Sequence, residues 1–237
     1  MRTLITDTLV FFALLIPARC AVAVDNTVIG GYHSSGVFAY SHTCTGPSRV
    51  LFVHVWGDTS DTTTEVTYAG VPMIALAKLD PTGTHSPYWQ YVFYLIAPTQ
   101  GANNVVVTST NQTITISESF TGASQASQPG SWSVISDAIA SATGTSALTF
   151  PAGADGGYLA AYLGDNFGPP LPVSPGTVSA ADDAYELTHV LNSSGPVSGG
   201  SNGLSFNTVG GGYYNAIIYS IAPDTAPNRA RHEVISQ

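Results

Sequence analysis

Three acidic residues follow an apolar run, and their types and spacing fit metal chemistry. In the stretch WGDTSDTTTE they are Asp58, Asp61 and Glu65. Carboxylate oxygens are preferred ligands of Ca²⁺, which takes about six to eight of them. The stretch lacks the fixed Gly and terminal Glu of an EF-hand loop, and Asp, Ser and Thr also populate turns because they hydrogen-bond the local backbone. Two interpretations remain open, a Ca²⁺ site and an exposed connection between strands.

A serine at position 201 could be a catalytic nucleophile. It lies in GGSNG, which matches G-x-S-x-G, and Asp224 and His232 follow it in the order of α/β-hydrolases. That chemistry needs a strained turn between a strand and a helix, whereas this serine lies in a Gly/Ser-rich loop between predicted strands. The histidines show no metal-binding spacing, and no phosphate-binding or dinucleotide motif is present. We therefore predict no catalytic residues and no enzymatic activity.

An aromatic segment, SPYWQYVFYLIAP at 86–98, could bind sugars. Exposed aromatic side chains stack on sugar rings, and the candidates are Tyr88, Trp89 and, further along the chain, Trp132. The alternative is a central strand with both faces buried. Strand alternation would then place Trp89, Tyr91, Phe93 and Leu95 on one face and Tyr88, Val92 and Tyr94 on the other.

The composition limits the classes of partner. The 237 residues are 44% hydrophobic and 9% charged, with 24 Gly and 15 Pro, which suits short strands joined by tight turns. The formal net charge is −9 and no basic stripe is present, so we predict neither a nucleic-acid nor a membrane partner. Cys20 and Cys44 are too few for a disulfide framework, and the sequence leaves open whether they pair.

Short runs rich in Val, Ile, Thr, Tyr and Phe recur from Gly36 onward, with turn residues between them. This spacing predicts an all-β, antiparallel two-sheet β-sandwich. In the run 50–56, alternation gives two largely apolar faces, which predicts a central strand buried on both sides: Phe52, His54 and Trp56 form one face, and Leu51, Val53 and Val55 form the other. The proline-rich stretch at 167–176 predicts a surface loop, because proline cannot join a central strand.

The first residues, MRTLITDTLVFFALLIPARCAVAVDN, allow two interpretations. Arg2, the apolar run and AVA at 21–23 fit a secretory signal cleaved near residue 23, whereas Asp7 and Arg19 depart from that pattern and favour a retained arm. The run is shorter than the roughly 20 apolar residues of a transmembrane helix. Because exposed apolar side chains are costly, we predict that the arm docks on a partner. Its docking residues are Leu9, Val10, Phe11, Phe12, Leu14, Leu15 and Ile16.

Six phrases resemble a β-sandwich module found in phage structural proteins and in secreted and surface proteins of bacteria. They span about residues 35–223 and are SHTCTGPSRVLFVHVWGD, TEVTYAGVPMIAL, YVFYLIAPTQGANNVVVTS, ISESFTGA, GGYLAAYLGD and NAIIYSIAP. The likeness lies in strand and turn patterning. It implies a jelly-roll-like sandwich with a structural, decorative or adhesive role.

These observations predict three parts: an N-terminal arm at 1–34 (or a signal peptide to about residue 23), a sandwich domain at 35–223 and a polar tail at 224–237. By analogy, one domain with one arm suits a non-enzymatic structural subunit of a phage virion, such as a decoration, cement or head-fibre protein. Such a subunit would form homo-oligomers and bind other virion proteins. The alternative is an exported carbohydrate-binding or adhesive module, secreted or held at the cell surface. Neither role needs a cofactor, apart from Ca²⁺ at the acidic turn.

Overall fold

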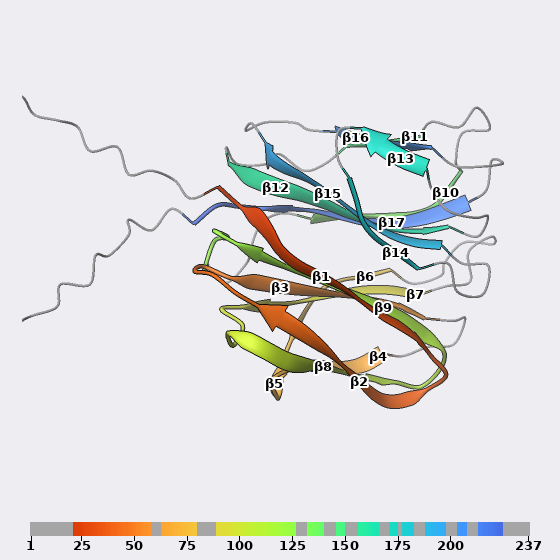
Figure 1. Ribbon diagram of the computed structural model, residues 1–237. Helices are drawn as coiled ribbons and strands as arrows, with labels where there is room; N and C mark the ends of the chain where they lie inside the picture. The colour runs from red at the N-terminus through yellow and green to blue at the C-terminus, as the bar shows by residue number, and fades with distance from the viewer. Residues whose placement is uncertain are drawn as a thin grey trace, which may run out of the picture.

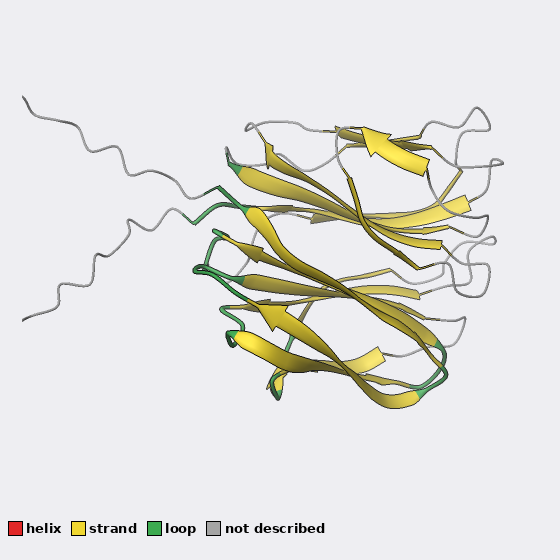
Figure 2. Ribbon diagram, in the orientation of Figure 1, coloured by secondary structure: helices red, strands yellow, loops and turns green. Residues whose placement is uncertain are grey.

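The computed structural model describes residues 21–57, 63–79, 89–126, 132–139, 146–149, 156–165, 171–174, 177–182, 188–197, 203–207 and 213–224 (Figure 2). Within these ranges every regular element is a strand, and the strands pair antiparallel. The predicted all-β antiparallel sandwich is confirmed.

Nine strands form the first half of the chain. They are β1 (Ala23–His33), β2 (Gly36–Cys44), β3 (Val50–Gly57), β4 (Thr63–Tyr68), β5 (Val71–Pro72), β6 (Ile74–Leu79), β7 (Trp89–Ile96), β8 (Gly101–Ser109) and β9 (Thr113–Thr121). The described strands of the second half are β10 (Trp132–Ile139), β11 (Ser146–Thr149), β12 (Gly157–Asp165), β13 (Leu171–Ser174), β14 (Thr177–Asp182), β15 (Thr188–Val197), β16 (Gly203–Asn207) and β17 (Tyr213–Ile221).

The strands form four sheets, which we call A to D. Sheet A has the order β1-β9-β3-β7-β6, and sheet B has the order β2-β8-β4-β5. Sheet C has the order β10-β17-β12-β15-β14, and sheet D has the order β11-β16-β13. Figure 1 shows them as successive layers, B, A, C and D, so that sheet A lies between sheets B and C.

The central strands of sheet A are buried on both faces because a sheet packs against each face. All eight residues of β3 are buried. Phe52 and Trp56 belong to the hydrophobic core that sheet A shares with sheet C, whereas Leu51 and Val53 belong to the core that it shares with sheet B. The predicted two-sided burial of this strand, and its assignment of side chains to faces, are therefore confirmed.

A tight turn joins β4 to β5. Tyr68 pairs with Val71, and both residues between them have positive φ, 51° at Ala69 and 77° at Gly70. Two left-handed residues in succession define a type I′ turn, the hairpin connection whose twist matches that of paired strands. Glycine adopts this conformation without strain, which explains its place in the turn.

Three strands lie where the sequence predicts none: β1, β13 and β14. β1 falls inside the segment assigned to the N-terminal arm, yet it pairs with β9 along its length. At Gly30, β1 lies so close to side chains of β9 and β2 that a Cβ atom on this residue would be 2.2 Å from Thr115 Oγ1 and 2.6 Å from the Tyr40 ring. β13 falls inside the predicted proline-rich loop. It is an edge strand of sheet D, the position at which a sheet tolerates Pro172.

Candidate functional site

A histidine and a serine lie in contact between β2 and β9, and these residue types can perform nucleophilic catalysis. His42 Nδ1 lies 2.8 Å from Ser117 Oγ. Asp25, on the neighbouring strand β1, completes the residue types of a Ser-His-Asp triad. However, His42 is only 1% exposed and Ser117 is 0% exposed, so a substrate cannot reach the hydroxyl without opening the sheets.

The carboxylate of Asp25 is held by other partners. It accepts hydrogen bonds from the Thr45 backbone N–H at 2.7 Å, from the Thr45 hydroxyl and from Ser119 Oγ at 2.9 Å. Partial burial raises the pKa of Asp25, but the hydrogen bonds from Thr45 and Ser119 and the charge of His42 bring that pKa below its ordinary value. Asp25, on β1, is therefore a structural residue: its carboxylate binds Thr45, which follows β2, and Ser119 of β9. These contacts hold the segment after β2 in place and do not orient His42 for catalysis.

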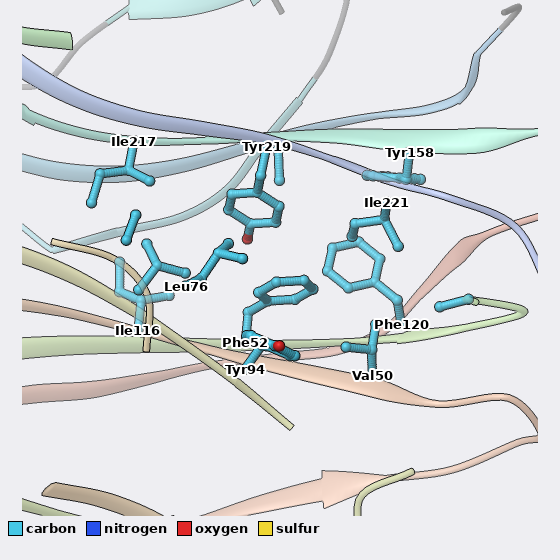
Figure 3. Close-up of a cluster of buried hydrophobic side chains, with 14 of the residues drawn as sticks. Val50, Phe52, Leu76, Tyr94, Ile116, Phe120, Tyr158, Ile217, Tyr219 and Ile221 are labelled. Carbon is cyan, nitrogen blue, oxygen red and sulfur yellow. The ribbon is translucent and has the colours of Figure 1, made fainter. Parts of the chain in front are cut away.

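A second buried polar group lies between sheets A and C, beside the hydrophobic cluster in which Figure 3 labels Phe52 and Tyr219. His54 Nε2 lies 3.0 Å from the Tyr219 hydroxyl, and the two rings are stacked with centroids 5.7 Å apart. Phe52 stacks on the same tyrosine at 4.5 Å. Glu118 is 0% exposed and accepts a hydrogen bond from Thr27 Oγ1 at 3.1 Å. The contacts of Tyr219 join β3 of sheet A to β17 of sheet C, and the hydrogen bond of Glu118 joins β9 to β1 within sheet A.

Burial sets the charge of these groups. It lowers the pKa of His42 to about 4, against an opposing effect of Asp25, and it lowers the pKa of His54 to about 3. Burial and the negative charge of Glu118 raise the pKa of Tyr219 well above its ordinary value. Both histidines are therefore neutral and weakly basic at pH 7, whereas a general base works best with a pKa near the working pH. The arrangement suits cohesion between sheets better than proton transfer.

An aromatic row runs along β7. The rings of Trp89, Tyr91 and Phe93 are stacked, with successive centroids 6.3 Å and 6.2 Å apart. Tyr91 and Phe93 are buried, and Trp89 is half-buried with Lys78 Nζ 4.1 Å above its ring. The predicted faces of this strand are confirmed, since these three rings and Leu95 line the core toward sheet B. The opposite face is also core, because Val92 and Tyr94 pack toward sheet C.

Most of the predicted docking, metal and sugar-binding residues lie outside the described residues: Leu9, Val10, Phe11, Phe12, Leu14, Leu15, Ile16, Asp58, Asp61 and Tyr88. Glu65 is exposed on β4, opposite Thr108 of β8. Trp132 begins β10, and its side chain is outside the described set. No group of three or more His, Cys, Asp and Glu that could hold a metal ion occurs among the described residues. The Ca²⁺ site therefore stays a prediction.

The Ser201 motif is divided by the described ranges, since Ser201 and His232 lie outside them. Asp224 lies inside and accepts a hydrogen bond from Ser48 Oγ at 2.6 Å. Among the described residues Cys44 is a free thiol, and burial raises its pKa. Cys20 lies outside these residues, so whether the two cysteines pair stays open. In the part of the chain that the structure describes, no helix is long and apolar enough to cross a membrane.

The two buried polar groups were missed by sequence reasoning. The segment TITISESF carries part of the signal, because alternation places Glu118 on the apolar face of Ile114 and Ile116 and places Ser117 on the opposite face. The hydrogen-bond partner of Ser117 is His42, 75 residues away, and that of Glu118 is Thr27, 91 residues away. Both pairs can be recognised only from the strand register and the packing of the sheets.

Searches of family models, of curated proteins and of solved structures find no match to the chain. The contacts described above are the basis for the functional proposal.

Proposed function

We propose that the chain is a non-enzymatic structural subunit of an assembly, of the kind that decorates a phage virion. It docks on other virion proteins and on copies of itself through the apolar segment 9–16. The observation that supports this role is the enclosure of the reactive side chains: His42, His54 and Glu118 are each at most 1% exposed, and the two histidines hydrogen-bond across neighbouring sheets. Hydrogen bonds in a low-dielectric interior are stronger than in water and hold neighbouring sheets together, which suits a structural component of a particle.

The jelly-roll form of the sandwich is part of the proposal. Its support is the nested pairing of the first half: β1 pairs with β9, β2 with β8, β3 with β7 and β4 with β5. A long hairpin wrapped into two sheets produces this pairing, and the jelly roll is the sandwich built in that way. Sheets of this kind serve capsid and lectin proteins alike, so the topology is compatible with both the virion role and the carbohydrate-binding alternative.

The experiment for the docking role replaces Phe11, Phe12 and Leu15 together with Ser in the full chain. Particles are purified from the native source after complementation with this variant, and the amount of the chain in them is measured. We expect a folded protein, judged by circular dichroism, that is missing from the particles. The matched control is Val37→Ser, which removes an exposed apolar side chain elsewhere. Incorporation of the triple variant at the level of this control would contradict the docking role.

The second candidate is an exported carbohydrate-binding module, and the position of Trp89 favours it. This ring is half-buried and begins the aromatic row, with Lys78 above it, and a partly exposed tryptophan ring is a surface on which a sugar could stack. A glycan array tests it with the wild-type chain, Trp89→Ala and Trp132→Ala, and Val37→Ser as the control. Binding that is lost in a tryptophan variant and kept in the control would support the candidate. Failure of the wild-type chain to bind any glycan would remove it.

A further inference from the structure

The two halves of the chain repeat one strand order. Sheet A has the order β1-β9-β3-β7-β6, and sheet C has the order β10-β17-β12-β15-β14. When the strands of each half are numbered along the chain with β5 left out, these two orders are the same. In the outer sheets, β2, β8 and β4 correspond to β11, β16 and β13. The two-residue strand β5 is the one element of the first half without a counterpart among the described residues. The correspondence therefore covers both sheets of each half.

The strand registers correspond as well. Residues 50–57 of β3 pair with residues 120–113 of β9, and residues 158–165 of β12 pair with residues 221–214 of β17. Neither pairing contains a register shift. Within it, Leu51 lies opposite Ser119 as Leu159 lies opposite Ser220.

Two local irregularities recur at matching positions. In β6, two paired residues precede a bulge at Leu76 and three follow it, and β14 has the same pattern around Ser179. Two residues before the matched positions 50 and 158, the backbone turns to positive φ, 49° at Ser48 and 78° at Gly156. A bulge is a specific one-residue insertion in a ladder, so its recurrence is stronger support for a shared origin than strand order alone.

The matched positions also meet in space. Residues at equivalent places in sheets A and C contribute to one hydrophobic core: Val50, Phe52, Ile116 and Phe120 from sheet A, and Tyr158, Ala160, Ile217 and Ile221 from sheet C (Figure 3). The same patch on each half thus faces its counterpart, as in the isologous interfaces of two-fold dimers.

We infer that residues 23–121 and 132–221 are two copies of one sandwich module, and that the face of sheet A carrying Phe52 is a docking surface for a second copy. The chain supplies that copy itself, so it is a covalently joined dimer of modules. Residues 35–223, which the sequence predicts as one domain, are thereby divided between two modules. This division does not depend on the proposed virion role.

The two copies have diverged where they meet, which identifies the partner as the sister module rather than an identical one. The large Phe52 matches the small Ala160, and Glu118 matches Tyr219. If two copies of the first module packed through this face, the buried carboxylate of Glu118 in one copy would face the same carboxylate in the other, which is unfavourable for like charges. Instead the sister module supplies Tyr219, which contacts both Phe52 and His54.

The experiment starts from the full chain with a protease site placed in residues 127–131, between the modules, and cleaves it under native conditions. We expect the two fragments to elute together at the mass of the intact chain. The same cleavage is then applied to Ala160→Arg, which places a charge in the docking face without shortening a core side chain. We expect its fragments to elute separately while each keeps a β-sheet circular dichroism spectrum.

The matched variant is Leu159→Arg, because the adjacent side chain of β12 points to the opposite face, into the core of the second module. We expect it to unfold that module. Separation of the cleaved wild-type fragments at micromolar concentration would overturn the docking surface. Co-elution of the cleaved Ala160→Arg fragments would also overturn it. Unfolding of either fragment after Ala160→Arg separates them would overturn the division into modules.

Discussion

The two faces of sheet A pack against sheets from different halves of the chain, although the same strands form both faces. Toward sheet B, which comes from the same half, β3 contributes Leu51 and Val53 to the core. Toward sheet C, which comes from the other half, the same strand contributes Phe52. Each face also holds a buried polar pair, His42 with Ser117 toward sheet B and His54 with Tyr219 toward sheet C. The faces therefore differ in the origin of the sheet that covers them: the first is the interior of one sandwich, and the second is the proposed interface between two.

Acidification gives the largest expected effect, and it acts on both faces. The pKa is about 4 for His42 and about 3 for His54 in the folded chain, against about 6.5 in an unfolded one. The unfolded chain therefore binds more protons below pH 6.5, and the free energy of unfolding falls as the pH drops from 7 toward 4. At about 1.4 kcal/mol per pH unit for each histidine, the loss is several kcal/mol.

Urea unfolding at a series of pH values measures this loss. The variant His54→Gln separates the two faces, since it should flatten the pH dependence by about half while His42 keeps the rest. The lowered pKa of Asp25 acts in the same direction at lower pH. A wild-type unfolding free energy that is constant between pH 7 and pH 4 would contradict the neutral, buried state of both histidines.

Shortening core side chains is expected to have the next largest effect. Leu51→Ala should destabilise the first sandwich by about 2–5 kcal/mol, and Phe52→Ala should cost about 3–5 kcal/mol, because each leaves a cavity among buried neighbours. Thermal and urea unfolding measure both losses. A loss below about 1 kcal/mol at either position would mean that the face it lines is loosely packed.

Removing one hydroxyl from each face should have a smaller effect. Tyr219→Phe removes the hydrogen-bond partner of His54 Nε2, which should cost about 1–3 kcal/mol because the histidine is buried. Tyr68 donates to the carbonyl oxygens of His42 and Gly101, so Tyr68→Phe on the other face should cost about 0.5–1.5 kcal/mol. Equal unfolding midpoints for the two variants would contradict the expected difference in the free-energy cost of losing a hydroxyl group on the two faces.

The smallest effect is expected at Val37, on the outer surface of sheet B. This side chain is 70% exposed, so Val37→Ser should change the free energy of unfolding by less than about 0.5 kcal/mol. A urea titration of this variant sets the baseline for the others. A loss comparable to that of Leu51→Ala would show that this surface is covered in solution.

Continuous apolar runs made the central strands predictable. β3 and β7 carry apolar residues on both faces, and their positions and faces follow from alternation alone. β1 escaped prediction because Asp25, Asn26 and Gly30 dilute its pattern, and its pairing with β9 comes from the tertiary structure.

The duplication and the buried polar groups could not be read from the sequence for a related reason. Matched positions hold different residue types, as Phe52 and Ala160 do, so the halves share a topology without an evident repeat. Hydrogen bonds such as that between His54 and Tyr219 join positions 165 residues apart, and only the register and the packing of sheets bring them together.

The most direct test compares hydrogen exchange in Leu51→Ala and Phe52→Ala by mass spectrometry, because these neighbours on β3 face the two cores. We expect Leu51→Ala to accelerate exchange throughout residues 21–126 and to leave residues 213–224 close to wild type. We expect Phe52→Ala to accelerate exchange in β17 as well as in β3 and β9. The same pattern of exchange in both variants would contradict the separation of sheet A into a module core and a docking face.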